Sequence, residues 1–188
     1  MTILAAMLEP STGRAYIASD SAGTGSTVRV DFGSKLVRIS PSIVIGIAST
    51  YLLSRWLRET RAAPAPLDTS LPDFDLQLDG FCDSWRKWGK ERGLGHTEND
   101  GSHHVPGDML VATPSKLYTI DRTGAVNGHA GLYAAVGGGE EVALGSLHIA
   151  QALGIDARKA VKGAVEASIH HHIYCGGEVF VERVSVDD

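Results

Sequence analysis

The chain has 188 residues, of which 43% are apolar, and a formal net charge of −5. This length fits one domain with a substantial core, so we expect residues 1–188 to fold as a single unit. The charge gives no reason to expect nucleic acid, and no apolar run has the length of a membrane span or the pattern of a signal peptide. Two distant cysteines, Cys82 and Cys175, favour a reducing cytoplasm over a disulfide framework.

The first third of the sequence contains short β-like runs separated by turn residues. The segment 9–13, Glu-Pro-Ser-Thr-Gly, predicts a hairpin turn between the first two runs. A helical spacing of apolar residues follows and ends before Pro64 and Pro66. We expect strands at 2–8, 14–19, 27–30, 35–39 and 43–48, and a helix at 50–61.

The remainder alternates helices and strands. A segment rich in Gly, Asn, Asp and His predicts an exposed loop at 93–107, and Asp156 is a candidate N-cap. We expect helices at 75–92, 139–153 and 156–170, strands at 108–113, 116–121 and 133–136, and a strand pair within 173–186. This order predicts two packed sheets covered by helices on both outer faces.

Thr2 is the first candidate functional residue. If Met1 is removed, which small second residues permit, Thr2 carries both a hydroxyl and a free α-amine at the start of an apolar strand. An α-amine titrates at about 7.7–8.0, so it can act as the base for its own hydroxyl. This is the N-terminal-threonine form of nucleophilic catalysis. If Met1 is retained, the Thr2 nitrogen is an amide and cannot act as a base.

Five further segments, in order along the chain, complete a family pattern with Thr2. They are Tyr16–Ser21, Gly33–Ile39, Ile43–Ser49, Ala134–Gly145 and Ile173–Val181. In this pattern the chain resembles proteasome β-type subunits, and most closely the HslV type of bacterial proteasome. The resemblance implies an α+β fold of the Ntn-hydrolase superfamily, a four-layer αββα sandwich of two mainly antiparallel sheets. It also implies a threonine-type endopeptidase that works inside a closed ring.

The resemblance assigns roles to individual residues. Lys35 would lie beside the Thr2 hydroxyl and lower the cost of forming the alkoxide, and Asp20 would keep Lys35 in place and charged. Gly46 would offer its backbone N–H to the oxyanion. The expected substrate-binding residues are Gly23, Thr24, Ile45 and Ala48, and the aliphatic walls of the last two favour apolar substrate side chains.

The supporting residues depart from the family pattern. Gly138 stands where related subunits generally carry a Ser that assists the amine, and His172 and Cys175 stand where most carry an Asp and a Ser or Thr. The triple glycine 137–139 does not predict a phosphate loop, because two glutamates and no Lys-Ser/Thr follow it. Two alternatives therefore stay open: a non-peptidolytic ring or scaffold, and an Ntn amidohydrolase of small amides.

Two runs of adjacent histidines, 103–104 and 170–172, do not predict a metal site. Adjacent histidines on a helix point in different directions, whereas metal ligands are usually spaced, for example at i and i+4. We expect no metal and no cofactor. The expected partners are polypeptide substrates, copies of this chain in stacked hexameric or heptameric rings and, by resemblance alone, an ATP-dependent unfoldase. Neither nucleic acid nor membrane is expected as a partner.

Overall fold

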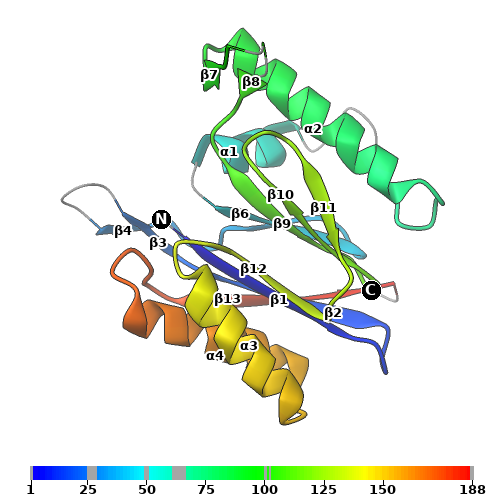
Figure 1. Ribbon diagram of the computed structural model, residues 1–188, viewed down its shortest axis with the longest axis vertical. Coiled ribbons are helices and arrows are strands. Elements are labelled where there is room, and N and C mark those ends of the chain that lie inside the picture. The colour runs from blue at the N-terminus through cyan, green and yellow to red at the C-terminus, as the bar shows by residue number, and fades with distance from the viewer. Residues whose placement is uncertain are drawn as a thin grey trace.

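Two sheets stack face to face between two pairs of helices in the computed structural model (Figure 1). The structure describes residues 2–24, 29–48, 51–60, 67–99, 101 and 103–186. One pair of helices covers the outer face of each sheet, as the contacts of their buried side chains show. The predicted four-layer αββα sandwich is therefore confirmed.

The first sheet is antiparallel and has the strand order β12-β1-β2-β13. Its central strand β1 is buried on both faces, because one face meets helices and the other meets the second sheet. The strands are β1 (Ile3–Glu9), β2 (Arg14–Asp20), β12 (Tyr133–Gly137) and β13 (Val179–Ser185).

The second sheet is also antiparallel and has the order β11-β10-β9-β6-β5. Its strands are β5 (Leu36–Ser40), β6 (Ile43–Ala48), β9 (Asp108–Ala112), β10 (Leu117–Ile120) and β11 (Val126–His129). Two small two-stranded sheets accompany it: β3 (Ala22–Thr24) with β4 (Arg29–Asp31), and β7 (His96–Thr97) with β8 (His103–His104).

Four helices form the outer layers. On the second sheet lie α1 (Tyr51–Thr60) and α2 (Phe74–Glu91), and on the first sheet lie α3 (Glu140–Ala152) and α4 (Ala157–His171). The Asp156 carboxylate accepts a hydrogen bond from the Lys159 N–H at 3.0 Å, so the predicted N-cap of α4 is confirmed. Among the described residues, none of the helices combines the length and the apolar character needed to cross a bilayer.

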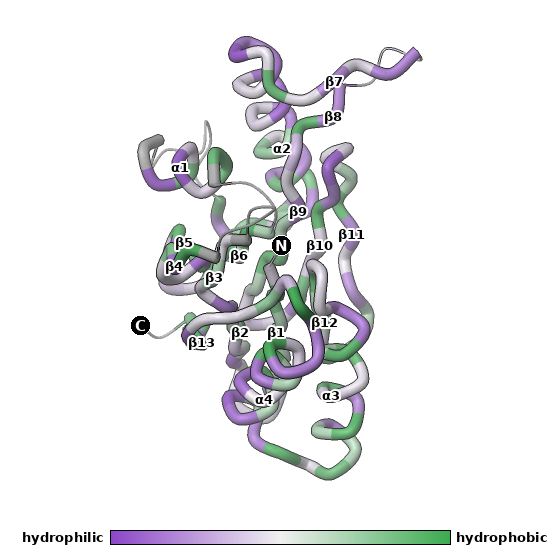
Figure 2. The backbone as a smooth tube through the Cα atoms, turned by 90° about the vertical axis from the view of Figure 1, so that its left-hand side faces the viewer, coloured by the Kyte–Doolittle hydropathy of each residue, from purple (hydrophilic) through white to green (hydrophobic). Residues whose placement is uncertain are grey.

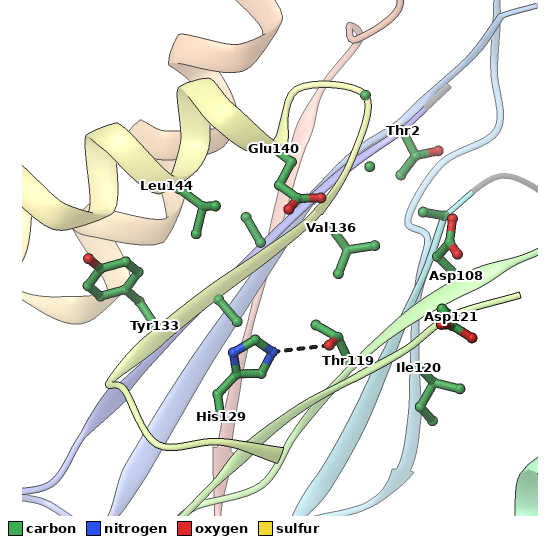
Figure 3. A pocket seen from close by; sticks show the side chains of 15 residues that line it. Thr2, Asp108, Thr119, Ile120, Asp121, His129, Tyr133, Val136, Glu140 and Leu144 are labelled. Carbon is green, nitrogen blue, oxygen red and sulfur yellow. Dashed lines mark hydrogen bonds between the residues drawn. The ribbon is translucent and has the colours of Figure 1, made fainter. Parts of the chain in front are cut away.

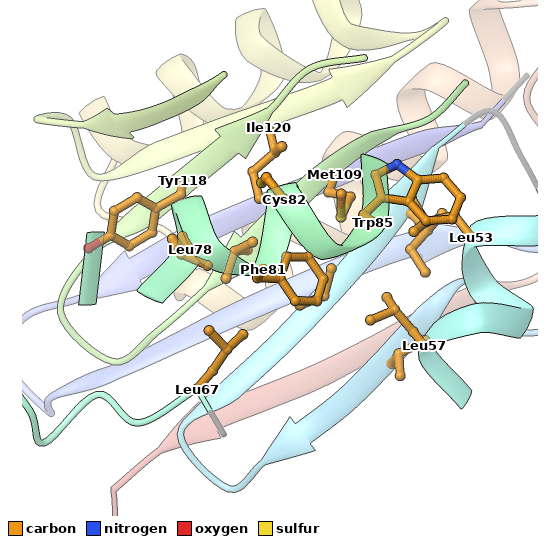
Figure 4. Packing of buried hydrophobic residues seen from close by; sticks show 14 of the residues in the cluster. Leu53, Leu57, Leu67, Leu78, Phe81, Cys82, Trp85, Met109, Tyr118 and Ile120 are labelled. Atoms are coloured by element: carbon orange, nitrogen blue, oxygen red, sulfur yellow. The ribbon is translucent and has the colours of Figure 1, made fainter. Parts of the chain in front are cut away.

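Three apolar layers hold the sandwich together. Apolar segments of the backbone concentrate in the sheets, whereas the region of β7 is hydrophilic (Figure 2). Under α1 and α2, the Trp56 ring packs against Phe81 and Trp85 with centroids 5.3 Å apart in both pairs, and Figure 4 shows α2 side chains meeting the second sheet. Such packing of large aromatic surfaces is a principal source of core stability.

Most expected elements are found within one or two residues of their predicted ends, and the differences are instructive. The segment 173–186 contains one strand instead of a pair, and the loop at 93–107 contains β7 and β8. Strands β3 and β11 were not anticipated. Parts of two predictions, residues 27–28 of a strand and residues 50 and 61 of a helix, lie outside the described residues.

Candidate active site

Asp20 and Lys35 form a buried ion pair beside the start of β1. The Lys35 Nζ lies 2.6 Å from Asp20 Oδ1, and the two side chains are 11% and 0% exposed. The same Oδ1 accepts a hydrogen bond from the backbone N–H of Ile3 at 3.1 Å. Asp20 Oδ1 thus accepts hydrogen bonds both from Lys35 and from Ile3, the residue after Thr2. This shared oxygen brings the start of β1, Asp20 and Lys35 together.

The loop between α4 and β13 holds the other side of Asp20. The Gly176 N–H donates to Asp20 Oδ2 at 3.0 Å, and the Gly176 carbonyl accepts from the Ala22 N–H at 2.9 Å. A Cβ on Gly177 would lie 2.1 Å from the Ser21 hydroxyl, and its φ of +79° also favours glycine. Three donors, two backbone N–H groups and the Lys35 Nζ, therefore satisfy the buried Asp20 carboxyl group.

Lys35 is held in a site that disfavours its charge. Its Nζ also donates to the Ala22 carbonyl at 2.7 Å, and its backbone N–H donates to the Ser19 hydroxyl at 3.4 Å. Burial lowers the pKa of Lys35 below its ordinary value, although the charges of Asp20, Cys175 and Asp31 act in the opposite direction. The charged form of Lys35 therefore depends on Asp20, the carboxylate that also binds the Ile3 N–H.

Thr2 lies where strands β1 and β12 meet. It is 6% exposed, and its carbonyl accepts a hydrogen bond from the Gly138 N–H at 2.9 Å. A Cβ on Gly137 would come within 2.1 Å of the Thr2 carbonyl oxygen, and Gly137 has a φ of +115°. Both facts require glycine at position 137, so the turn into α3 fits closely around the nucleophile candidate.

A cavity of about 560 Å³ begins at Thr2 and extends between the β9–β10–β11 region and β12–α3 (Figure 3). Ala48, at the end of β6, also lines it. Three carboxylates, those of Asp108, Asp121 and Glu140, belong to its wall, and His129 is the one basic side chain among the described residues that line it. The cavity is therefore electronegative.

The pKa values of two of these carboxylates, Glu140 and Asp121, are shifted in opposite directions. Burial raises the pKa of Glu140, and the negative charge of Asp108 acts in the same direction against a hydrogen bond from Gly137. At Asp121 burial acts to raise the pKa, but hydrogen bonds from Thr123 and Ala125 outweigh it and lower the pKa. Removing the charge of Asp108 or placing a cation in the cavity would therefore favour the ionised form of Glu140.

The structure argues against the expected role of Gly46. This residue lies in the middle of β6, paired with Leu36 of β5 on one side and with Leu110 of β9 on the other. Its N–H points at one of these strands, so it is not offered to an oxyanion. Glycine is required there for packing, because a Cβ would lie 2.9 Å from the Leu4 side chain in the layer between the sheets.

The expected substrate wall is also only partly correct. Ile45 is buried in the layer under α1 and α2, on the face of β6 that turns away from the cavity, and it is not among the described residues that line the cavity. Ala48 does reach the cavity. Residues 49–50, which follow it, lie outside the described residues.

Gly23 and Thr24 lie on β3, immediately after the Ala22 carbonyl that binds Lys35. A Cβ on Gly23 would overlap the Phe32 ring at 1.8 Å, which explains the glycine by packing. Gly23 is not among the described residues that line the cavity, and the Thr24 side chain lies outside the described part of the structure. Their part in substrate binding stays a prediction.

The three supporting positions come together around the glycine turn. The Cys175 Sγ lies 3.8 Å from His172 Nδ1, and Cys175 is fully buried whereas His172 is half-buried. A Cβ on Gly139 would lie 3.1 Å from that sulfur. Ser168 of α4, which sequence reasoning missed, donates to the Gly139 carbonyl at 3.0 Å and so helps to hold this turn.

No protein-family model and no curated protein matches this sequence. Solved structures do match over nearly the whole chain. Thiobacillus denitrificans BPH in complex with epoxomicin is 18% identical, with a TM-score of 0.82 over 99% of this chain and 100% of that one. The same BPH without epoxomicin is 18% identical, with a TM-score of 0.81 over 99% of this chain and 98% of that one. Eukaryotic HslV from Trypanosoma brucei is 20% identical, with a TM-score of 0.72 over 98% of this chain and 99% of that one.

The chain has the proteasome β-type fold of HslV. At these identities the likeness establishes the fold, and the activity has to be argued from the site itself. Within this fold Thr2, Asp20 and Lys35 stand at one end of the sandwich, where β1, β2 and the segment before β5 meet.

One group of side chains in the described residues has the composition and closeness to hold a metal ion. It consists of His96, Glu98 and His104, away from Thr2. The adjacent histidines of α4 do not take part: the rings of His170 and His171 meet edge to face with centroids 4.7 Å apart.

Proposed function

We propose that this protein is a threonine-type endopeptidase in which Thr2, freed by removal of Met1, is the nucleophile. The observation that carries the proposal is the Asp20 Oδ1 atom, which accepts hydrogen bonds from both the Ile3 N–H and the Lys35 ammonium. A buried lysine fixed beside a buried N-terminal threonine serves no obvious packing purpose, because burying its charge is costly. It does serve nucleophile formation.

In the proposed reaction the Thr2 hydroxyl attacks a peptide carbonyl while the Thr2 amine accepts the hydroxyl proton, directly or through water. The Lys35 charge lowers the cost of the developing alkoxide, and Asp20 holds Lys35 in position. The C–N bond then breaks, the amine leaves with the proton, and water releases the acyl group from Thr2. The T. denitrificans neighbour was obtained with epoxomicin, a peptide epoxyketone, bound to the same fold.

The cavity favours basic over apolar substrate side chains. Its wall carries Asp108, Asp121 and Glu140 close to Thr2, and no Lys or Arg is among its described lining. An ammonium or guanidinium group would find an attractive field there, whereas an anionic side chain would be repelled. We therefore propose that the peptidase prefers a Lys or Arg residue near the cleaved bond.

The outer surface of α3 supports assembly with further copies of the chain. Ile149 and Leu153 are 57% and 71% exposed near its end, and Ile155 of the following turn is 43% exposed. Exposed apolar residues gathered on one surface are typical of interfaces. We propose stacked hexameric or heptameric rings in the cytoplasm, which would keep the peptidase away from folded cellular proteins. A separate ATP-dependent unfoldase would supply substrates.

A non-peptidolytic ring is the second candidate function. Position 138 carries no hydroxyl to assist the Thr2 amine, and its N–H is engaged by the Thr2 carbonyl. An Ntn amidohydrolase of small amides is a third alternative.

Labelling with epoxomicin tests the proposal. Intact mass first shows whether Met1 is absent, and the epoxyketone, which needs both the hydroxyl and the amine of an N-terminal threonine, should then add one inhibitor mass to the Thr2 peptide. The Thr2→Ala variant is the control and should take up none. Labelling at Cys175, or none with Met1 absent, would overturn the assignment.

A further inference from the structure

The β7–β8 ribbon, residues 96–97 and 103–104, together with Glu98 directly after β7, brings three side chains of metal-ligating type close together. His96 pairs directly with His104 across the ribbon, and Glu98 follows His96 by two residues. Directly opposed residues, and residues two apart in extended chain, project from the same face. One ligand atom from each of His96, Glu98 and His104 lies within 4.8 Å of the other two.

We propose that His96, Glu98 and His104 bind one Zn²⁺ ion. Two imidazoles and a carboxylate, with the remaining position open to water, form a donor set that zinc accepts. Tetrahedral bonds of about 2.0–2.2 Å place neighbouring donor atoms about 3.3 Å apart. His96 Nε2 and Glu98 Oε1 are 2.8 Å apart, and the two imidazole centroids are 5.3 Å apart. Rotation of the exposed His96 and Glu98 side chains toward the half-buried His104 would close this geometry.

The backbone of the ribbon is fixed before any metal arrives. Gly95 has a φ of +83°, and a Cβ there would lie 1.9 Å from the His104 carbonyl oxygen, so only glycine permits this approach. Val105, directly after the ribbon, is buried against Gly89 of α2, where a Cβ would meet it at 2.8 Å. The two histidine backbones are therefore held at a set separation, which lowers the entropic cost of metal binding.

His103 has a different task on the opposite face of the ribbon. Its Nδ1 is 3.0 Å from the Thr97 hydroxyl, and its Nε2 is 2.8 Å from the Leu94 carbonyl oxygen. Both ring nitrogens are thus engaged in bracing the ribbon. The adjacent histidines 103 and 104 are separated by strand alternation, and His104 finds its partner on the other strand.

The zinc site lies at the end of the molecule opposite α3 and α4 (Figure 1). It is independent of the proposed peptidase activity. A bound ion would link three side chains across the ribbon and stabilise the ribbon against the end of α2, since a ligand that binds the folded state alone stabilises it.

Calorimetric titration of the tag-free full chain with Zn²⁺ near neutral pH tests the proposal. We expect one ion per chain with a dissociation constant on the order of micromolar. His104→Ala should weaken Zn²⁺ binding by about a hundredfold or more, because removing a ligand costs at least as much affinity as removing a hydrogen-bond partner of a ligand. The matched control, His171→Ala, removes an exposed histidine outside the site and should leave binding unchanged. Circular dichroism verifies that each variant is folded.

Cobalt substitution provides a second measurement that does not depend on affinity alone. Co²⁺ bound by His96, Glu98 and His104 should give the visible absorption bands of a four-coordinate site, absent in His96→Ala and present in His171→Ala. The proposal is overturned if Zn²⁺ shows no saturable binding at about 100 times the expected micromolar dissociation constant. It is also overturned if His96→Ala and His104→Ala bind Zn²⁺ as tightly as the parent.

Discussion

The two sides of Thr2 are built differently. On the Lys35 side, each polar group is satisfied by a named partner: Asp20 takes donors from Ile3, Lys35 and Gly176. On the cavity side, the position expected to assist the amine is Gly138, and the wall beyond it carries carboxylates. In the proposed mechanism the Lys35 side would stabilise charge on Thr2, while the cavity side offers no hydroxyl at position 138 to assist the Thr2 amine.

This difference separates two properties that a peptidase needs. The buried pair is expected to determine whether an alkoxide can form at all, because positioned charges in a dry site are worth far more than in water. The cavity side is expected to determine rate and selectivity. Mutations on the two sides should therefore differ in size and in kind.

Lys35→Ala should produce the largest effect. Removing the Lys35 ammonium should reduce peptide cleavage by on the order of a hundredfold or more, because losing one positioned electrostatic group commonly costs that much. The matched control is Lys116→Ala, which removes a surface lysine paired with Asp75 at 3.2 Å and should leave cleavage unchanged. Cleavage that survives in Lys35→Ala at the parent rate would assign the activity to another site.

Asp20→Asn should have the next largest effect and should change the pH profile. Burial lowers the pKa of Lys35, and the charge of Asp20 is the largest effect that raises it. Removing the charge of Asp20 therefore lowers the pKa of Lys35 further. If the charged lysine is needed, the alkaline limb of kcat/KM moves to lower pH, while Asn still offers an oxygen to the Ile3 N–H. A profile whose alkaline limb is unmoved would show that Lys35 does not act through its charge.

Much of the fold could be predicted because its signals are local. The spacing of Leu78, Phe81 and Trp85 marks one face of α2, and the turn residues before Arg14 mark the first hairpin. Strand β11 lacked such a signal, since Val-Asn-Gly-His alternates weakly and is half-exposed or exposed along its length. Strand β11 is ordered by its pairing with β10, and the local sequence does not reveal this contact.

The errors at β6 have the same origin. Its residues are buried on both faces, so the apolar run carries no alternation that tells which side faces the active site. Register places Ile45 under the helices and Gly46 against Leu4. Likewise, the hydrogen bond from Gly176 to Asp20 joins residues 156 positions apart, and no spacing rule reaches that far.

Glu140→Gln tests the cavity side through selectivity. With one of the three carboxylates neutral, kcat/KM for a peptide with Arg or Lys should fall several-fold, while a matched peptide with Leu should change little. A uniform loss for both peptides would mean that Glu140 only shapes the backbone.

Stability supplies a second readout for the same variant. Burial raises the pKa of Glu140 above its ordinary 4.5, so its contribution to folding stability is fully present below pH 4.5 and is lost as pH rises through the folded-state value. We compare the stability of Glu140→Gln with that of the parent by thermal unfolding at pH 4 and at pH 7. The stability of the variant relative to the parent should be greater at pH 7 than at pH 4. A variant that is less stable at pH 7 than at pH 4, each relative to the parent, would contradict this sign.

Gly138→Ser should give the smallest change, and in the opposite direction, because it adds a hydroxyl beside the Thr2 amine. Gly137 has a positive φ, which disfavours a side chain, whereas Gly138 is not among the positive-φ glycines of the described chain. A serine at position 138 is therefore not strained by its backbone conformation. If the amine lacks an assisting group, turnover should rise by a few-fold, since general acid–base assistance increases rate when a partner is correctly placed. Gly138→Ala is the matched control: it adds the same Cβ without a hydroxyl and should not raise turnover. An equal rise in both variants would indicate a backbone effect, whereas no rise in Ser, with epoxomicin still labelling Thr2, would show that the amine already has its proton route through water.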